Sequence, residues 1–286
     1  MKQQQQQEHQ ILETYGRFTV AVKANQELSE LSWSKGRICL SNRRLVLITN
    51  DGKKTISLAD LTGISGGEGS IGALSEYLKL QISGDTVVVS AEDHSKFKTS
   101  LYSTLLESAV LRVKYPAVAG GVIKDTSWKQ ARLSVALDSL TASLQNGKRI
   151  EFQLADITSV QLEDRAVDGE STQVVAVSHT ADGGAVETHL TGSPRLRLFS
   201  KAFLKHGERE GAIDVELNPA EEEILMGLYS GVSPFKIPEF VGMEIDKVEA
   251  IYDRLIELGI LDRVRTRSEV TVTASGRAIT SDAASE

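Results

Sequence analysis

Apolar and polar residues alternate in short runs through the first two thirds of the chain, and the pattern occurs twice, about 95 residues apart. Trp33 opens the run WSKGRICLSNRRLVL and Trp128 opens WKQARLSVALDSLTASL, each with an arginine four residues later, Arg37 and Arg132. Later landmarks recur in the same order: GKK at 52–54 against GKR at 147–149, and LADLT at 58–62 against LADIT at 154–158. The sequence therefore predicts two copies of one domain.

Each copy predicts short antiparallel β-strands. Apolar residues alternate over a few positions between hairpin signals such as Asn50-Asp51-Gly52 and Asn146-Gly147. In the first copy seven strands are expected, near 17–22, 37–40, 45–48, 54–57, 61–64, 77–82 and 86–89.

An amphipathic helix is expected to close each copy. In the first copy Ser90 is the predicted cap, with Asp93 three residues later, and the apolar stripe is Phe97, Leu101 and Leu105. In the second, Ser193-Pro194 starts the helix, and the stripe is Leu196, Phe199 and Phe203. Seven strands followed by one helix is the element order of a pleckstrin-homology-like (PH-like) barrel; a β-sandwich is the alternative.

Helical periodicity replaces the strand pattern in the last third of the chain. The first helix is expected to start at Asn218-Pro219-Ala220-Glu221 and to bury Ile224, Leu225, Leu228 and Tyr229. A short helix with Pro238 near its start should follow, then a helix that buries Val248, Ile251, Tyr252, Leu255, Ile256 and Leu258 and ends at Gly259. Two β-runs, 261–264 and 269–273, complete the pattern of a winged helix.

The predicted fold class is therefore α+β, with tandem PH-like β-barrel domains of seven strands plus a C-terminal helix each, followed by a winged-helix domain. The expected boundaries are a disordered glutamine-rich tail at 1–10, the two PH-like domains at 11–109 and 110–208, the winged helix at 212–280 and a tail at 281–286.

Composition and charge favour protein partners over nucleic acid. The chain carries a formal net charge of −7, whereas phosphate-backbone binders usually have a basic excess. Between Asp214 and Arg263 twelve acids stand against four bases, and Asp246, Glu249, Asp253 and Glu257 lie on the helix that would read DNA. A DNA-binding regulator stays an alternative because the predicted wing is basic, with Arg263, Arg265, Arg267 and Arg277.

Catalytic chemistry finds no support in the sequence. Cys39 lies in an apolar alternation, as a structural thiol would, and the five histidines are scattered. No phosphate-binding loop, dinucleotide fingerprint or zinc-spaced Cys/His set occurs. We therefore expect no enzyme activity, no cofactor and no metal. No apolar window is long enough to span a membrane, so a cytoplasmic location without an integral membrane segment is expected.

Two surfaces are candidates for binding. Arg43, Arg44, Lys53 and Lys54 could cluster near hairpin tips and meet anionic lipid, which is the membrane-adaptor alternative. The favoured interpretation of these four residues is a solvated hairpin, since fold alone does not fix function. The segment SGVSPFKIPEFVGM, residues 230–243, surrounds one lysine with two prolines and two phenylalanines. It is either core and turns of the winged helix or a docking surface with exposed aromatic anchors.

Four stretches resemble the archaeal CheF family: GRICLSNRRLVLIT from Gly36, YPAVAGGVI from Tyr115, VETHLTG from Val186 and LMGLYSGVSPFKIPEFVGMEIDKVEAIYDRLIELGIL from Leu225. The resemblance implies a taxis adaptor that connects the response regulator CheY to the switch complex of the archaellum motor, at the inner face of the membrane. It also implies that phosphorylated CheY binds more strongly and changes the bias of rotation.

Our hypothesis for the contacts places CheY on the acidic winged helix and the 230–243 segment, and the motor on the β-domains. The expected partner-binding residues are Ser233, Pro234, Phe235, Ile237, Pro238, Phe240, Val241, Met243, Asp246, Glu249 and Asp253. The expected partners are CheY, preferably phosphorylated, and archaellum switch-complex proteins, without nucleic acid. Self-association into a homodimer is an open alternative.

Overall fold

The computed structural model describes residues 7–28, 31–66, 76–107, 109–181, 184–210, 217–258 and 260–261. The chain divides into two compact units, Met1–Asp214 and Val215–Glu286. The described strands all belong to the first unit, and the described part of the second is helical. Within the described residues, no helix has the length and apolar character needed to cross a membrane.

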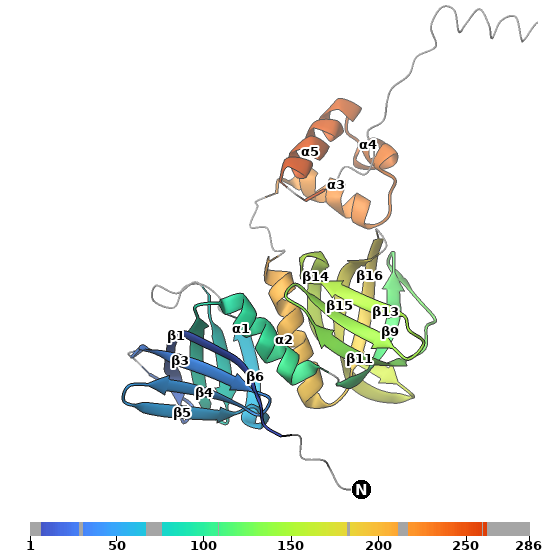
Figure 1. Ribbon diagram of the computed structural model, residues 1–286. Helices are drawn as coiled ribbons and strands as arrows, with labels where there is room; N and C mark the ends of the chain where they lie inside the picture. The colour runs from blue at the N-terminus through green and yellow to red at the C-terminus, as the bar shows by residue number, and fades with distance from the viewer. Residues whose placement is uncertain are drawn as a thin grey trace, which may run out of the picture. The chain divides into compact units, whose positions relative to one another are not determined.

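The first copy of the repeat forms one antiparallel sheet (Figure 1). Its strands are β1 (Gln10–Lys23), β2 (Gln26–Glu27), β3 (Ser34–Ser41), β4 (Arg44–Thr49), β5 (Gly52–Ser57), β6 (Leu61–Gly66), β7 (Leu78–Ile82) and β8 (Asp85–Ala91). The order is β5-β4-β3-β1-β8-β7-β6, and the two-residue strand β2 pairs with β1 outside this path. Strand β1 therefore holds the two halves of the sheet together.

The second copy repeats this arrangement. Its strands are β9 (Val110–Ala119), β10 (Val122–Ile123), β11 (Lys129–Val135), β12 (Ser139–Leu144), β13 (Arg149–Gln153), β14 (Ile157–Val167), β15 (Glu170–Ala181) and β16 (Gly184–Thr191). The order is β13-β12-β11-β9-β16-β15-β14, and β10 pairs with β9. The repeated LAD residues form matching 3₁₀ turns, η1 (Leu58–Asp60) and η2 (Leu154–Asp156).

Strand β1 extends further than its alternation predicts. The expected strand at 17–22 is its second half, and the observed strand begins at Gln10, inside the predicted tail. Residues Gln10 to Phe18 pair with β3, and Gly16 to Val22 pair with β8. Pairing with two neighbours, rather than the apolar pattern of β1 itself, sets this length.

One helix follows each sheet: α1 (His94–Leu106) and α2 (Pro194–Glu210). The predicted cap of the first helix is wrong, because Asp93 rather than Ser90 accepts the capping bond, from the Lys96 amide at 3.0 Å. The Ser90 hydroxyl instead donates to the Glu76 carbonyl oxygen at 2.7 Å. The second cap agrees with the prediction: the Leu196 amide donates to Ser193 Oγ at 3.3 Å.

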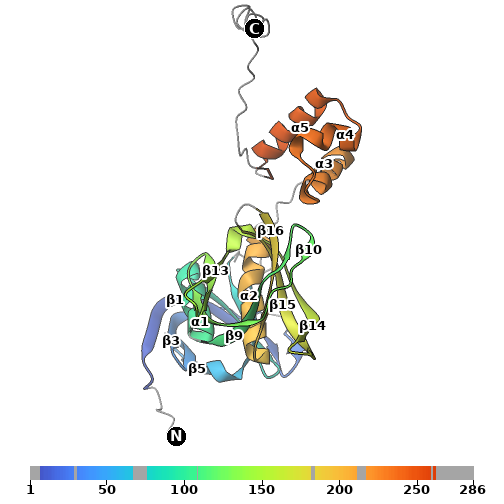
Figure 2. The same cartoon turned by 90° about the vertical axis from the view of Figure 1, so that its right-hand side faces the viewer.

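Both copies contribute to one hydrophobic core. Phe97, Leu101 and Tyr102 from α1 are buried in the same cluster as Phe199 and Phe203 from α2. The Tyr102 and Phe203 rings meet edge to face, with centroids 5.1 Å apart, and Tyr102 Oη lies 3.3 Å from His206 Nε2. Helices α1 and α2 therefore join the two copies into one packed unit, as both views show (Figures 1 and 2).

The second unit contains α3 (Pro219–Tyr229), the 3₁₀ turn η3 (Pro234–Lys236), α4 (Ile237–Val241) and α5 (Ile245–Glu257). Its core cluster of Ile224, Ile237 and Val248 draws one fully buried residue from each of the three helices. The predicted capping box is confirmed: Asn218 Oδ1 accepts from the Glu221 amide at 3.0 Å, and Glu221 Oε2 accepts from the Asn218 amide at 2.8 Å. The predicted terminator Gly259, the β-runs at 261–264 and 269–273 and the tail at 281–286 lie outside the described residues, save Leu261.

Candidate partner-binding surface

The 230–243 segment is held by two glycines and two prolines. Gly231 and Gly242 adopt positive φ angles of 86° and 66°, a conformation that glycine takes without strain. Pro234 begins η3 and Pro238 lies in the first turn of α4, where the missing amide hydrogen would have no helical acceptor. The segment therefore folds into two short helical turns with sharp ends.

The predicted binding residues of this segment divide between the surface and the core. Phe235 is 76% exposed and Phe240 is 56% exposed, and Ser233 and Pro234 are exposed as well. Ile237 is fully buried, while Pro238, Val241 and Met243 are half-buried. Successive residues of a helical turn point in different directions, so the two aromatic rings lie at the surface while Ile237 anchors the segment.

Helix α3 presents two exposed apolar residues that are not among the predicted binding residues. Met226 is exposed, and Tyr229, which was predicted to be buried, is exposed too. Gly227, which lies between them, faces the core. A Cβ added at this position would lie 2.8 Å from the Ile237 side chain and 3.1 Å from the Phe240 ring. A glycine inside a helix is the sequence signal for such close packing, and it places Phe240 directly against α3.

The acidic residues of α5 form a stripe on its solvent side. Asp246, Glu249 and Asp253 are all exposed, whereas Val248 and Leu255 on the other side are buried. Two contacts fix α5 to the rest of the unit. The Tyr252 hydroxyl donates to the Pro234 carbonyl oxygen at 3.0 Å, and Arg254 Nη1 lies 3.0 Å from Glu221 Oε1.

The four basic residues considered for lipid binding do not form one cluster. Arg44 pairs with Ser57 in the β4–β5 ladder and Lys53 pairs with Ile48, four residues further along the strand, a distance of about 13 Å. Arg44 also makes two hydrogen bonds to the Glu8 carboxylate, at 2.7 and 2.6 Å. The β4–β5 ladder therefore separates the members of the grouping that lipid binding would need, which favours the reading as a solvated hairpin.

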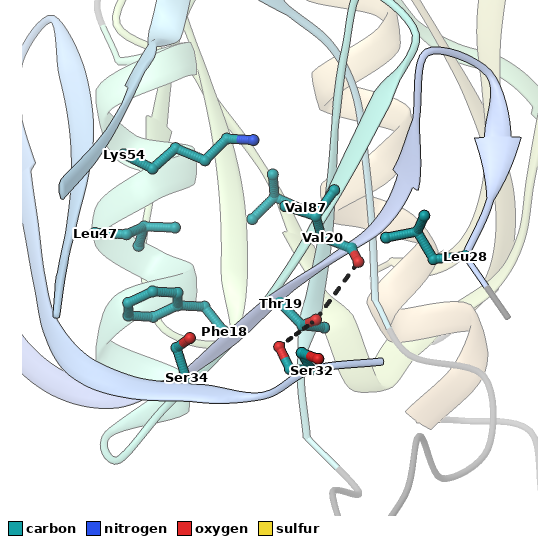
Figure 3. Close-up of a pocket in the computed structure, with 9 residues that line it drawn as sticks. All are labelled: Phe18, Thr19, Val20, Leu28, Ser32, Ser34, Leu47, Lys54 and Val87. Carbon is teal, nitrogen blue, oxygen red and sulfur yellow. Dashed lines mark hydrogen bonds between the residues drawn. The ribbon is translucent and has the colours of Figure 1, made fainter. Parts of the chain in front are cut away.

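A shallow hollow of about 290 Å³ lies beside Lys54 in the first sheet (Figure 3). Phe18, Leu47 and Val87 form its apolar side, and the Lys54 ammonium extends over it. Lys54 Nζ lies 3.6 Å from Asp85 Oδ2, so its charge is already balanced. The other lining residues are apolar or carry only hydroxyl groups, as Thr19, Ser32 and Ser34 do, so the hollow offers no unpaired positive charge to a phosphorylated headgroup.

Glu163, Glu187 and His189 place ligand atoms within 4.8 Å of one another on the second sheet. His189 Nε2 lies 2.6 Å from Glu187 Oε1, and Glu163 is ion-paired with Arg165. Each of the three side chains therefore already has a protein partner. His179 on the neighbouring strand β15 pairs with Val186 and packs on Phe152, so it is not part of this cluster.

Comparison with known proteins places this chain in a family. Residues 10–209 match the family model described as archaeal chemotaxis signal transduction system protein F, and residues 216–285 match a domain of unknown function. The chain is 37% identical to Taxis protein CheF1 of Halobacterium salinarum over 286 residues, 98% of each chain. It is 25% identical to Taxis protein CheF2 of the same organism over 268 residues, 87% of this chain and 89% of that protein.

Among solved structures, the pleckstrin homology domain of ArhGAP27 aligns with a TM-score of 0.29 and 12% identity, over 34% of this chain and 98% of that domain. The family match covers both sheets, and the relatives match along nearly the whole chain. The chain therefore belongs to the archaeal family of chemotaxis signal transduction system protein F.

Proposed function

We propose that this chain is a taxis adaptor that carries the phosphorylation state of CheY to the switch complex of the archaellum motor and thereby controls the direction of rotation. Membership in a chemotaxis signal-transduction family supports this role. As an adaptor the chain works by binding alone, close to the motor at the inner face of the membrane. It must bind the two states of CheY unequally, because a partner with equal affinity for both states shifts no equilibrium.

The fold proposed for this adaptor is two PH-like barrels and a winged helix. The first part is supported by the matching strand orders of the two sheets and by the helix that follows each. Support for the second part comes from three helices around one small core, with the capping box at the predicted start.

One observation carries the choice of the CheY surface. Phe235 and Phe240 are held largely in solvent by a segment whose remaining apolar residues pack inward. Aromatic side chains are enriched among the residues that dominate protein interfaces, since each buries a large area at little cost in conformational entropy. We assign these two rings as the anchors for CheY.

The acidic stripe of α5 supplies the second element of the proposed surface. Asp246, Glu249 and Asp253 would attract a basic region on the partner and speed the encounter, particularly at low salt. The same charges disfavour nucleic acid, because they would lie against phosphate groups. The two sheets, on this proposal, contact the switch complex.

A pulldown with phosphorylated and unphosphorylated CheY tests the proposal on the full chain. Phe235→Ala and Phe240→Ala should each weaken recovery of phosphorylated CheY about ten-fold or more, as expected for interface anchors. Tyr15→Ala is the matched control, because Tyr15 is a 56% exposed aromatic residue on the first sheet. Equal recovery by all variants would reject the surface, and equal recovery of both CheY forms would reject the signalling role.

A further inference from the structure

The YPAVAGGVI stretch, which the proposed function leaves unexplained, forms the β9–β10 hairpin at one end of the second sheet (Figure 2). Val122 pairs with Ala119 across a two-residue turn of Gly120 and Gly121, whose φ angles are 57° and 74°. Positive φ at both central residues is typical of the tightest hairpin turn, which glycine adopts without strain. The tip is therefore short and narrow.

Backbone hydrogen bonds fix this hairpin on both sides of the turn. The Gly120 amide donates to the Ala185 carbonyl oxygen at 3.1 Å, and the Lys124 amide donates to the Ala117 carbonyl oxygen at 2.9 Å. The Thr126 hydroxyl donates to the Pro116 carbonyl oxygen at 2.7 Å. The tip is thus presented in one defined orientation.

The side chains at this tip are aliphatic and face solvent. Val122 is 59% exposed and Ile123 is 80% exposed, the largest exposed fraction of any large apolar side chain in the described part of the chain. Hairpin tips in water usually carry polar turn residues. Neither side chain belongs to the hydrophobic core, so packing within the described residues does not explain them.

The first copy provides an internal comparison for the same hairpin. There β1 and β2 are joined by Ala24 and Asn25, whose φ angles of 52° and 64° give the same kind of turn. Gln26 occupies the position that follows the turn, where Val122 stands in the second copy. The same turn is therefore followed by a polar residue in the first copy and by an apolar residue in the second. The turn geometry does not require Val122 and Ile123.

We propose that the β9–β10 tip inserts Val122 and Ile123 into the interfacial layer of a lipid bilayer and gives the chain a weak, reversible membrane contact. A protein partner that received only this narrow tip would bury far less than the roughly 800 Å² per side of a stable interface. A bilayer needs no matching pocket, and a few inserted apolar side chains support reversible binding.

Charges beside the tip nearly cancel. Lys124 directly follows the tip and is itself followed by the exposed acid Asp125. A second acid, Glu187 on β16, pairs with Val118, the residue that also pairs with Ile123. Insertion of the aliphatic pair is therefore the source of affinity, and negative lipid is not required.

Vesicle flotation of the full chain tests this contact, with phosphatidylcholine vesicles and with vesicles that also contain phosphatidylglycerol. The chain should float with both to a similar extent, because the affinity comes from the aliphatic pair. The double variant Val122→Ser, Ile123→Ser should lose about ten-fold in binding or more, because two aliphatic side chains no longer leave water. Failure of the unchanged chain to float with either vesicle would overturn the proposal.

A matched double variant, Val110→Ser with Leu137→Ser, removes two other exposed aliphatic side chains of the second sheet. Val110 begins β9, at the opposite end of the strand from the tip. This control should float like the unchanged chain; equal losses in both double variants would mean nonspecific adhesion and reject the tip. An Ile123→Trp variant should gain fluorescence quenching by brominated lipid over the unchanged chain, and no gain would also contradict insertion. The CheY pulldown contains no lipid, so the two proposals fail independently.

Discussion

Arg195 Nη1, at the start of helix α2, donates a hydrogen bond of 3.1 Å to the Leu61 carbonyl oxygen at the start of β6, in the other copy of the repeat. The same guanidinium donates to the carbonyl oxygens of Ala59, at 3.2 Å, and of Leu58. It also lies 4.6 Å above the Phe199 ring. One side chain of the second copy therefore satisfies three backbone acceptors of the first.

Replacing Arg195 should loosen the packing between the two copies. Arg195→Met keeps a long unbranched side chain but removes the cation over the Phe199 ring and leaves three carbonyl groups without their charged donor, which should lower the free energy of unfolding by about 2–3 kcal/mol. Urea unfolding followed by circular dichroism measures this. Arg37→Met, which removes an exposed 3.1 Å ion pair with Glu13, is the control and should cost less than about 1 kcal/mol. If the two variants unfold alike, Arg195 has no special role.

Gly207→Ala should destabilise the chain although alanine is the better helix former by about 1 kcal/mol. A Cβ at Gly207 in α2 would lie 2.3 Å from the Leu154 carbonyl oxygen of η2, so the helix would have to move away, at an expected cost of about 1–3 kcal/mol. Gly184→Ala is the control, because its nearest neighbour would be 4.0 Å away. Thermal unfolding checks both, and a stabilised Gly207→Ala would show that α2 does not pack as described.

The free energy of unfolding should decrease as the pH is lowered from about 7.5 to about 5.5. This range brackets the histidine pKa of about 6.5 in unfolded chains. Burial lowers the pKa of His179 and of His94 below that value. Below the unfolded pKa the unfolded chain takes up protons that the folded chain does not, which favours unfolding, by at most about 1.4 kcal/mol per pH unit for each proton. His179→Gln should flatten the dependence of the urea midpoint on pH. An unchanged slope would contradict the part assigned to His179.

Glu221 should be the most sensitive polar residue of the second unit. Its side chain is only 1% exposed, and it bonds both the Asn218 amide and Arg254. Glu221→Ala should therefore lower the stability of this unit by about 1–3 kcal/mol and speed hydrogen exchange of the amides in α3 and α5. Glu222→Ala removes an exposed neighbour in the same first turn and should change little. Equal exchange rates in the two variants would count against the capping contact.

Within the described residues, the sequence by itself determined most of the elements and their order, because local signals fix them; the first half of β1 and the two-residue strand β2 were the exceptions. The alternating runs, the turn residues and the cap at Asn218 each act through neighbours in the chain, and the duplicated landmarks such as Trp33 and Trp128 marked the repeat. The family resemblance likewise came from stretches of consecutive residues. These local signals do not depend on how the elements are arranged in space.

Only the tertiary structure decided which residues meet and which remain in water. It buried Ile237 and exposed Phe235, separated Arg44 from Lys53 along the β4–β5 ladder, and brought Arg195 to Leu61. These outcomes depend on contacts between residues far apart in the chain, whose free energies no local pattern contains. The exposure of Ile123 was likewise decided by the tertiary structure, because a side chain is exposed only when no other part of the fold packs against it.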